Sequence, residues 1–167
     1  TPDFASQVHS LTGGRPPDGI FLTHAHIGHY TGLMYLGRES TDASRVPVYG
    51  TERMTGFLRA NGPWSQLVSR NNVDLRVIRP DAAVDLGAGV RVTAFTVPHR
   101  DEFTDTVGYL IEGPTRKALY IPDIDQWETQ RFLAPLGANA DARVWEGASV
   151  AGSLDMRDQP EAGAAFA

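Results

Sequence analysis

Three of the five histidines in this sequence lie within six residues of one another, in the run Thr23-His24-Ala25-His26-Ile27-Gly28-His29. An apolar segment precedes the run, and a segment of helical pattern follows it. In an extended chain, residues i and i+2 point to the same side, so His24 and His26 can converge on one ion. His29 lies where the chain turns toward the helix and can approach from another direction. Because neutral imidazole is the commonest metal ligand, the cluster predicts a metal site rather than a set of polar loop residues.

A fourth histidine follows a later apolar segment, in the run Phe95-Thr96-Val97-Pro98-His99. Pro98 ends the expected strand and leaves His99 at its mouth. A lone histidine here would be structural or exposed, but beside the first cluster His99 is the natural third ligand. Three imidazoles and a water form an open catalytic zinc site, in which the metal lowers the pKa of the water to about 7.

A carboxylate ends a third apolar segment, in the run Leu119-Tyr120-Ile121-Pro122-Asp123. A carboxylate at a strand end is often only a cap or a turn residue. Since three strand ends carry residues of metal-ligand type, we interpret Asp123 as the acidic partner of His24, His26 and His99.

Composition limits the kind of site and the kind of partner. The chain has 167 residues, which fits one domain, and it has no cysteine, so imidazole and carboxylate must hold any metal. The net charge of −5 argues against a dedicated nucleic-acid surface and favours a small-molecule substrate. No apolar run approaches the roughly 18 residues of a membrane span. The absence of cysteine and of an apolar leader favours a cytoplasmic location.

The elements that must position these residues alternate short apolar runs with amphipathic ones. Helices are expected at 30–38, 52–60, 64–69 and 127–133. Strands are expected at 19–23, 46–49, 73–78, 90–97, 106–111, 118–121 and 143–145, with a glycine turn at 87–89. The mixture predicts a single layered α/β or α+β domain over residues 1–150, followed by a loose tail at 151–167.

The motifs resemble those of the metallo-β-lactamase superfamily, in the branch that contains pyrroloquinoline quinone biosynthesis protein B. The histidine run, Asn61-Gly62-Pro63-Trp64, Val97 to Phe103 and Tyr120 to Asp123 carry the resemblance. It implies an αββα sandwich fold. It also implies that His24, His26 and His99 bind a first metal, that Asp123 bridges to a second metal, and that His29 binds the second. Catalytic roles would fall to Asp123 and His29.

The sequence departs from the superfamily pattern at both ends and at one site residue. The pattern His-x-His-x-Asp-His has an aspartate where this chain has Gly28, and no histidine follows His99, so the second metal site lacks two donors. Strands that precede the matching segment in the family are missing here. The chain is then either a fragment, or a partner chain covers the exposed sheet edge; we favour the partner chain, which predicts a homodimer.

Three functions follow from these observations. The first is an enzyme, a metallohydrolase with one zinc ion or two, acting on an ester, amide or phosphodiester. The second is a non-haem iron oxidoreductase, since three imidazoles and a carboxylate can also hold Fe(II). The third is a non-catalytic relative of the fold.

Of the acids after His99 (Asp101, Glu102 and Asp105), one could orient an imidazole, although solvated loop charge is the default for such residues.

Overall fold

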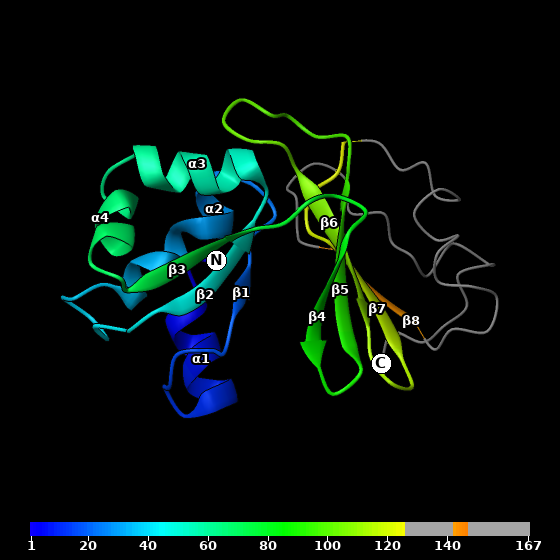
Figure 1. The fold of residues 1–167 in the computed structure, drawn as a ribbon, viewed down its shortest axis with the longest axis horizontal. Helices are drawn as coiled ribbons and strands as arrows, with labels where there is room; N and C mark the ends of the chain where they lie inside the picture. Colours follow the sequence, from blue (N-terminus) through cyan, green and yellow to red (C-terminus); the bar gives the residue numbers. More distant parts are fainter. Residues whose placement is uncertain (126–141, 147–167) are drawn as a thin grey trace. The chain divides into compact units, whose positions relative to one another are not determined.

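The computed structural model describes residues 1–125 and 142–146 (Figure 1). The chain divides into two compact units. Unit 1 is Thr1–Arg79 with Asp101–Asp105, and unit 2 is Pro80–Arg100 with Thr106–Ala167. The short segment Asp101–Asp105 therefore packs with unit 1, although it lies between two strands of unit 2 in the sequence.

Unit 1 is a three-stranded parallel sheet with helices. Its strands are β1 (Ile20–Phe21), β2 (Val46–Gly50) and β3 (Val73–Val77), in that order across the sheet. Parallel strands need a crossover connection, and between β2 and β3 this is made by the helices α3 (Glu52–Ala60) and α4 (Trp64–Ser69). The remaining helices are α1 (Phe4–Thr12), α2 (Ile27–Tyr30) and the 3-10 helix η1 (Thr31–Leu36).

The core of unit 1 fixes the faces of these elements. Along β2 the residues alternate between buried and half-buried, and Val48 is fully buried. On α3, Met54 and Leu58 are four residues apart and both buried, which gives the helix one apolar face toward the core. Trp64 at the start of α4 packs edge-on against Tyr30, with ring centroids 4.9 Å apart. The core therefore reaches the helix that follows the histidine run.

Thr51 starts α3 and connects it to the segment Asp101–Asp105. Its Oγ1 accepts a hydrogen bond from the backbone N–H of Met54 at 3.2 Å, which caps the helix. The same hydroxyl donates to Asp105 Oδ1 at 2.7 Å. Thr51 is almost fully buried; its bond with Met54 is buried and its bond with Asp105 is part-buried.

We expect Thr51→Ala to lower the free energy of unfolding by about 1–2 kcal/mol, because it removes the cap and leaves Asp105 without this donor. Thr51→Ser keeps the hydroxyl and should lose much less. Urea unfolding of the two variants beside the parent chain measures the difference. Equal stability of the alanine and serine variants would show that the cap does not stabilise α3.

Unit 2 is a five-stranded sheet in the described residues. Its strands β4 (Ala83–Gly87), β5 (Val90–Thr96), β6 (Val107–Glu112), β7 (Lys117–Ile121) and β8 (Ala142–Glu146) lie in sequence order. Neighbouring strands are antiparallel except β7 and β8, which are parallel. The turn from β4 to β5 uses positive φ angles at Gly87 and Gly89 (81° and 75°), as the glycine turn predicted.

Most predicted elements are confirmed, among them α3, α4 and every described strand except β4. The prediction of a single helix at 30–38 is wrong. The helical turn begins at Ile27 and tightens into a 3-10 helix at Thr31, a common change at the ends of short helices. Helix α1 and strand β4 were not predicted. The helix expected at 127–133 and the tail at 151–167 lie outside the described residues, and the single domain over 1–150 stays a prediction.

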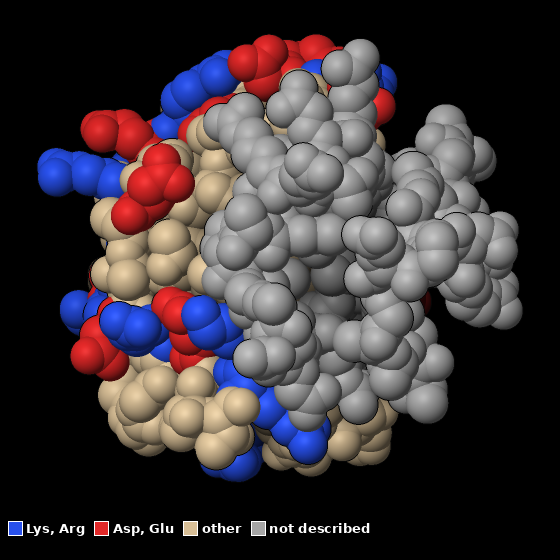
Figure 2. All heavy atoms as spheres, turned by 90° about the vertical axis from the view of Figure 1, so that its right-hand side faces the viewer, with Lys and Arg blue, Asp and Glu red and all other residues tan. Residues whose placement is uncertain are grey.

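The described surface carries mixed charge. On the face in Figure 2, basic and acidic side chains of the described residues are intermingled, and neither sign forms a continuous patch there. Among the described residues, none of the helices has the length and apolar character needed to cross a bilayer.

Candidate functional site

The three clustered histidines lie in the loop between β1 and α2. After β1 the backbone N–H of Leu22 still donates to Tyr49 O at 2.9 Å, so the chain stays beside β2 and enters the core. Residues 22–25 are all buried, and His24 is only 1% exposed. His26 is extended (φ −77°, ψ 139°) and directly precedes α2. This extended stretch puts His24 and His26 on one side, as the spacing predicted.

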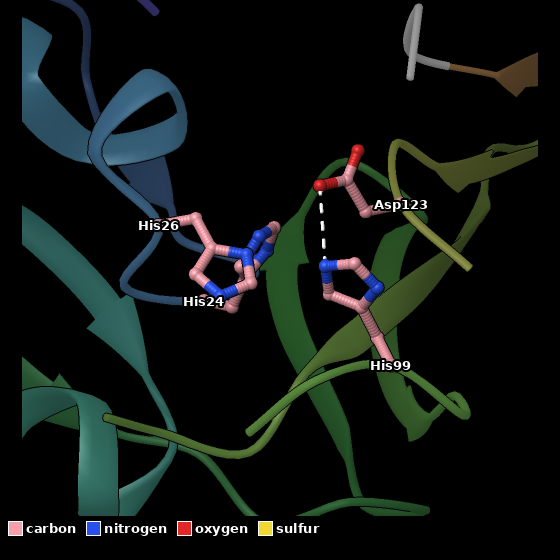
Figure 3. A group of neighbouring side chains, drawn as sticks. All are labelled: His24, His26, His99 and Asp123. Atoms are coloured by element: carbon pink, nitrogen blue, oxygen red, sulfur yellow. Dashed lines mark ion pairs between the residues drawn. The ribbon is translucent and has the colours of Figure 1, made fainter. Parts of the chain in front are cut away.

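The rings of the three histidines lie close together within unit 1. The ring centroids of His24 and His26 are 4.6 Å apart and nearly perpendicular (Figure 3), and those of His24 and His29 are 4.4 Å apart. His24 and His26 each offer a ring nitrogen within 4.8 Å of the other, a separation that one metal ion can bridge.

Neighbouring oxygens hold one ring nitrogen of His24 and one of His26. The Thr23 hydroxyl oxygen is 3.1 Å from His24 Nδ1. Glu102 Oε2 is 2.7 Å from His26 Nε2. Between the two histidines, the backbone N–H of Ala25 donates to Thr104 Oγ1 at 3.0 Å, which fixes the path of the loop. If these rings bind a metal, His24 would do so through Nε2 and His26 through Nδ1.

Unit 2 contains the other pair of predicted ligands. His99 follows β5 by three residues, and Asp123 follows β7 by two. His99 Nε2 is 3.4 Å from Asp123 Oδ2 (Figure 3), and the two side chains are 6% and 10% exposed. The two strand ends predicted to carry ligands therefore do bring their side chains together.

Asp125 fixes the orientation of His99. Its Oδ1 is 2.7 Å from His99 Nδ1, and its backbone N–H donates to Pro98 O at 2.8 Å. An ionised carboxylate can only accept, so Nδ1 carries the hydrogen. Nε2 then faces Asp123 either as a second N–H donor or, together with the Asp123 carboxylate, as a ligand of a cation.

Asp123 also affects a neighbouring strand residue. Burial raises the pKa of the Tyr120 hydroxyl above its ordinary value, and the negative charge of Asp123 raises that pKa further. Tyr120 thus stays protonated at neutral pH.

Tyr30, which follows His29, is buried and packs against Phe57 and Trp64. Of the three acids after His99, only Glu102 is bonded to a histidine, whereas Asp101 pairs with Arg53 and Asp105 with Thr51.

Two supporting contacts were not assigned from the sequence. Asp125 had no predicted role, although a second aspartate two residues after Asp123 was a usable signal. Thr104 had no signal at all. The metal-binding roles of His24, His26, His29, His99 and Asp123 stay predictions.

Solved structures share the fold of this chain. Zinc-bound PqqB from Methylobacterium extorquens matches with a TM-score of 0.68 and 22% identity, covering 89% of this chain and 54% of PqqB. A diphosphatase of the PhnP family matches with a TM-score of 0.60 and 23% identity, covering 86% of this chain and 52% of the diphosphatase. At these identities the similarity shows the fold alone.

A curated relative is more similar in sequence. Ribonuclease Z of Bradyrhizobium diazoefficiens is 31% identical over 122 residues, which cover 70% of this chain and 39% of that enzyme. This chain thus spans well under two thirds of the length of ribonuclease Z and about half that of PqqB.

A protein-family model identifies the superfamily of the chain. The model of the beta-lactamase superfamily domain matches residues 1–158, nearly the whole sequence. The mixed helix and sheet architecture predicted from the sequence agrees with the solved structures that share this fold. The chain therefore belongs to the beta-lactamase superfamily and has the metallo-β-lactamase fold.

Proposed function

We propose that this chain is a metal-dependent hydrolase in which His24, His26 and His99 hold one divalent ion and Asp123 completes the ligand set. One observation carries the proposal. In each of the three imidazoles, one ring nitrogen lies within hydrogen-bond distance of a neighbouring oxygen, at 2.7–3.1 Å. Imidazoles that bind metals in proteins are commonly oriented in this way through the second nitrogen.

The donor set suits zinc. Three imidazoles and a carboxylate, with no cysteine in the chain, match the ligands of catalytic zinc sites and also those of non-haem iron. Zinc is our first choice because the PqqB structure with this fold is a zinc complex. A bound divalent ion would supply an activated water, and its positive charge would stabilise the negative charge that develops on the substrate.

The residues of the chain would have separate tasks. Thr23 and Asp125 hold the rings of His24 and His99 in place. The Asp123 carboxylate lies beside Nε2 of His99. It would bind the ion and also accept a proton from the attacking water. Burial of His24 and Asp123 excludes bulk water from the ligands and strengthens their electrostatic interactions.

We propose a phosphodiester or a related phosphoryl bond as the substrate. Two of the relatives are named ribonuclease Z and a diphosphatase, and both names describe hydrolysis at phosphorus. A small substrate fits the net charge of −5 better than a long nucleic acid, which normally meets a basic surface. Carboxylic esters and amides are the other classes that the same chemistry serves.

The proposal is tested with the purified chain, stripped of metal and reloaded with zinc or with Fe(II). We expect the zinc form to hydrolyse bis(p-nitrophenyl) phosphate, and the activity to disappear when a chelator is added and to return with zinc. Parallel assays with p-nitrophenyl acetate and p-nitroanilides separate the substrate classes. Redox activity of the iron form alone would favour an oxidoreductase, and failure to bind either metal would favour a non-catalytic domain.

A further inference from the structure

The segment Asp101–Asp105 is attached to unit 1 at every one of its five residues. Each residue contacts a different position: Asp101 pairs with Arg53 (3.4 Å), Glu102 with His26 (2.7 Å), Phe103 with Phe57 (ring centroids 5.8 Å), Thr104 with the backbone N–H of Ala25 (3.0 Å) and Asp105 with Thr51 (2.7 Å). Five consecutive contacts fix the backbone of the segment. The position of Glu102 is therefore set by the fold and not by one flexible side chain.

Within this segment, Glu102 contacts the side chain of a proposed ligand, His26. Its side chain is 50% exposed and that of His26 is 20% exposed, so the pair lies at the edge of the histidine cluster. An exposed carboxylate gains little from an ordinary surface ion pair. A direct 2.7 Å contact with an imidazole, held by the neighbours on both sides, indicates a role in orienting that ring.

We infer that Glu102 is a positioning residue that makes His26 a metal ligand through Nδ1. The inference rests on the proposed function. An ionised carboxylate only accepts, so Nε2 of His26 carries the hydrogen and the lone pair of the neutral ring lies on Nδ1. The carboxylate also fixes the rotation of the ring and makes the Nδ1 lone pair a stronger metal ligand. Glu102 thus acts on the metal through His26 without contacting the metal itself.

The test measures zinc affinity by competition with a chromophoric chelator. Glu102→Ala should weaken zinc binding about 10- to 100-fold, the usual cost of losing such a partner. Glu102→Gln keeps an oxygen that can accept the same hydrogen bond and should recover most of the affinity. Asp101→Asn is the matched control, because it changes a neighbouring carboxylate that contacts Arg53 instead of a histidine.

A second pair of variants separates orientation of His26 from a general effect of the loop. In a His26→Ala background, Glu102→Ala should cause no further loss of zinc affinity, since the ring on which it acts is gone. Thermal unfolding of the metal-free proteins checks that each variant folds. If Glu102→Ala does not fold, Glu102→Met keeps the length of the side chain without the acceptor oxygen and replaces it in the comparison.

Three results would overturn the inference. Zinc binding by Glu102→Ala as tight as in the parent chain is one, and an equal loss in the His26→Ala background is another. The third is an Asp101→Asn variant that loses as much as Glu102→Ala. In all three cases the parent chain binds zinc and His26→Ala weakens it, so the proposed function stands. A parent chain that binds no zinc would instead refute the proposed function, and this inference with it.

Discussion

His24→Ala should leave the purified chain with less than about a tenth of the zinc bound by the parent chain after desalting. Zinc binding by four protein ligands is worth about 10–16 kcal/mol, so one ligand accounts for about 3–4 kcal/mol, or a factor of about 10² to 10³ in affinity. His24 is the most buried of the predicted ligands, at 1% exposed, and water cannot readily take its place. Inductively coupled plasma mass spectrometry gives the zinc content, and chelator competition gives the affinity.

The fifth histidine offers the control for this experiment. His9 lies exposed in α1 and belongs to none of the clusters described above. His9→Ala should therefore bind zinc and hydrolyse bis(p-nitrophenyl) phosphate as the parent chain does. His24→Asn fills more of the buried space than alanine and guards against loss of the fold. An unchanged zinc content in a folded His24→Ala variant would refute the ligand assignment.

Gly28→Asp should raise the capacity for zinc from about one ion per chain toward two. The resemblance to the superfamily implies an aspartate at this position as a ligand of the second metal, and the chain has glycine instead. A side chain fits here, because a Cβ at Gly28 would meet nothing within 4 Å, and the backbone is not in the left-handed region. The new carboxylate would stand one residue before His29, whose ring centroid is 4.4 Å from that of His24.

Zinc titration followed by mass spectrometry of the metal content measures the gain. One added ligand should tighten binding of the second ion by a factor of about 10². Gly28→Ala adds the Cβ without the carboxylate and should bind zinc as the parent chain does. Adding His29→Ala to Gly28→Asp should remove the gain. If Gly28→Asp folds and still binds only one zinc, His29 and Asp123 do not belong to a second metal site.

The parts of the fold that face the core were predictable from the sequence. Helix α3 has a capping threonine and a buried pair at Met54 and Leu58, so its bounds follow from local chemistry. Helix α1 has no buried residue, and therefore no apolar stripe marked it. Strand β4 is an edge strand whose residues are mostly exposed, with Leu86 45% exposed, and pairing with β5 defines it. Such pairing is not encoded in a local pattern.

In the candidate site, too, some features could be predicted from local sequence and others depend on how distant segments fold together. His24, His99 and Asp123 could be proposed as ligands from the sequence because each is a metal-ligand residue type that directly follows an apolar segment. The contact between His26 and Glu102 joins residues 76 positions apart and depends on how a loop folds back onto unit 1. Three acids in that loop are equivalent in the sequence, so nothing local could select Glu102. Asp125 was within reach of prediction, since it is a second carboxylate two residues after Asp123.

Anomalous diffraction at the zinc edge tests whether His24, His26 and His99 bind one ion, as we propose. Crystals of the zinc-loaded chain should give one strong peak about 2.0–2.1 Å from ring nitrogens of His24, His26 and His99, with an Asp123 oxygen at a similar distance. A peak bound by His24 and His26 without His99, or no peak at these residues, would contradict the proposed function.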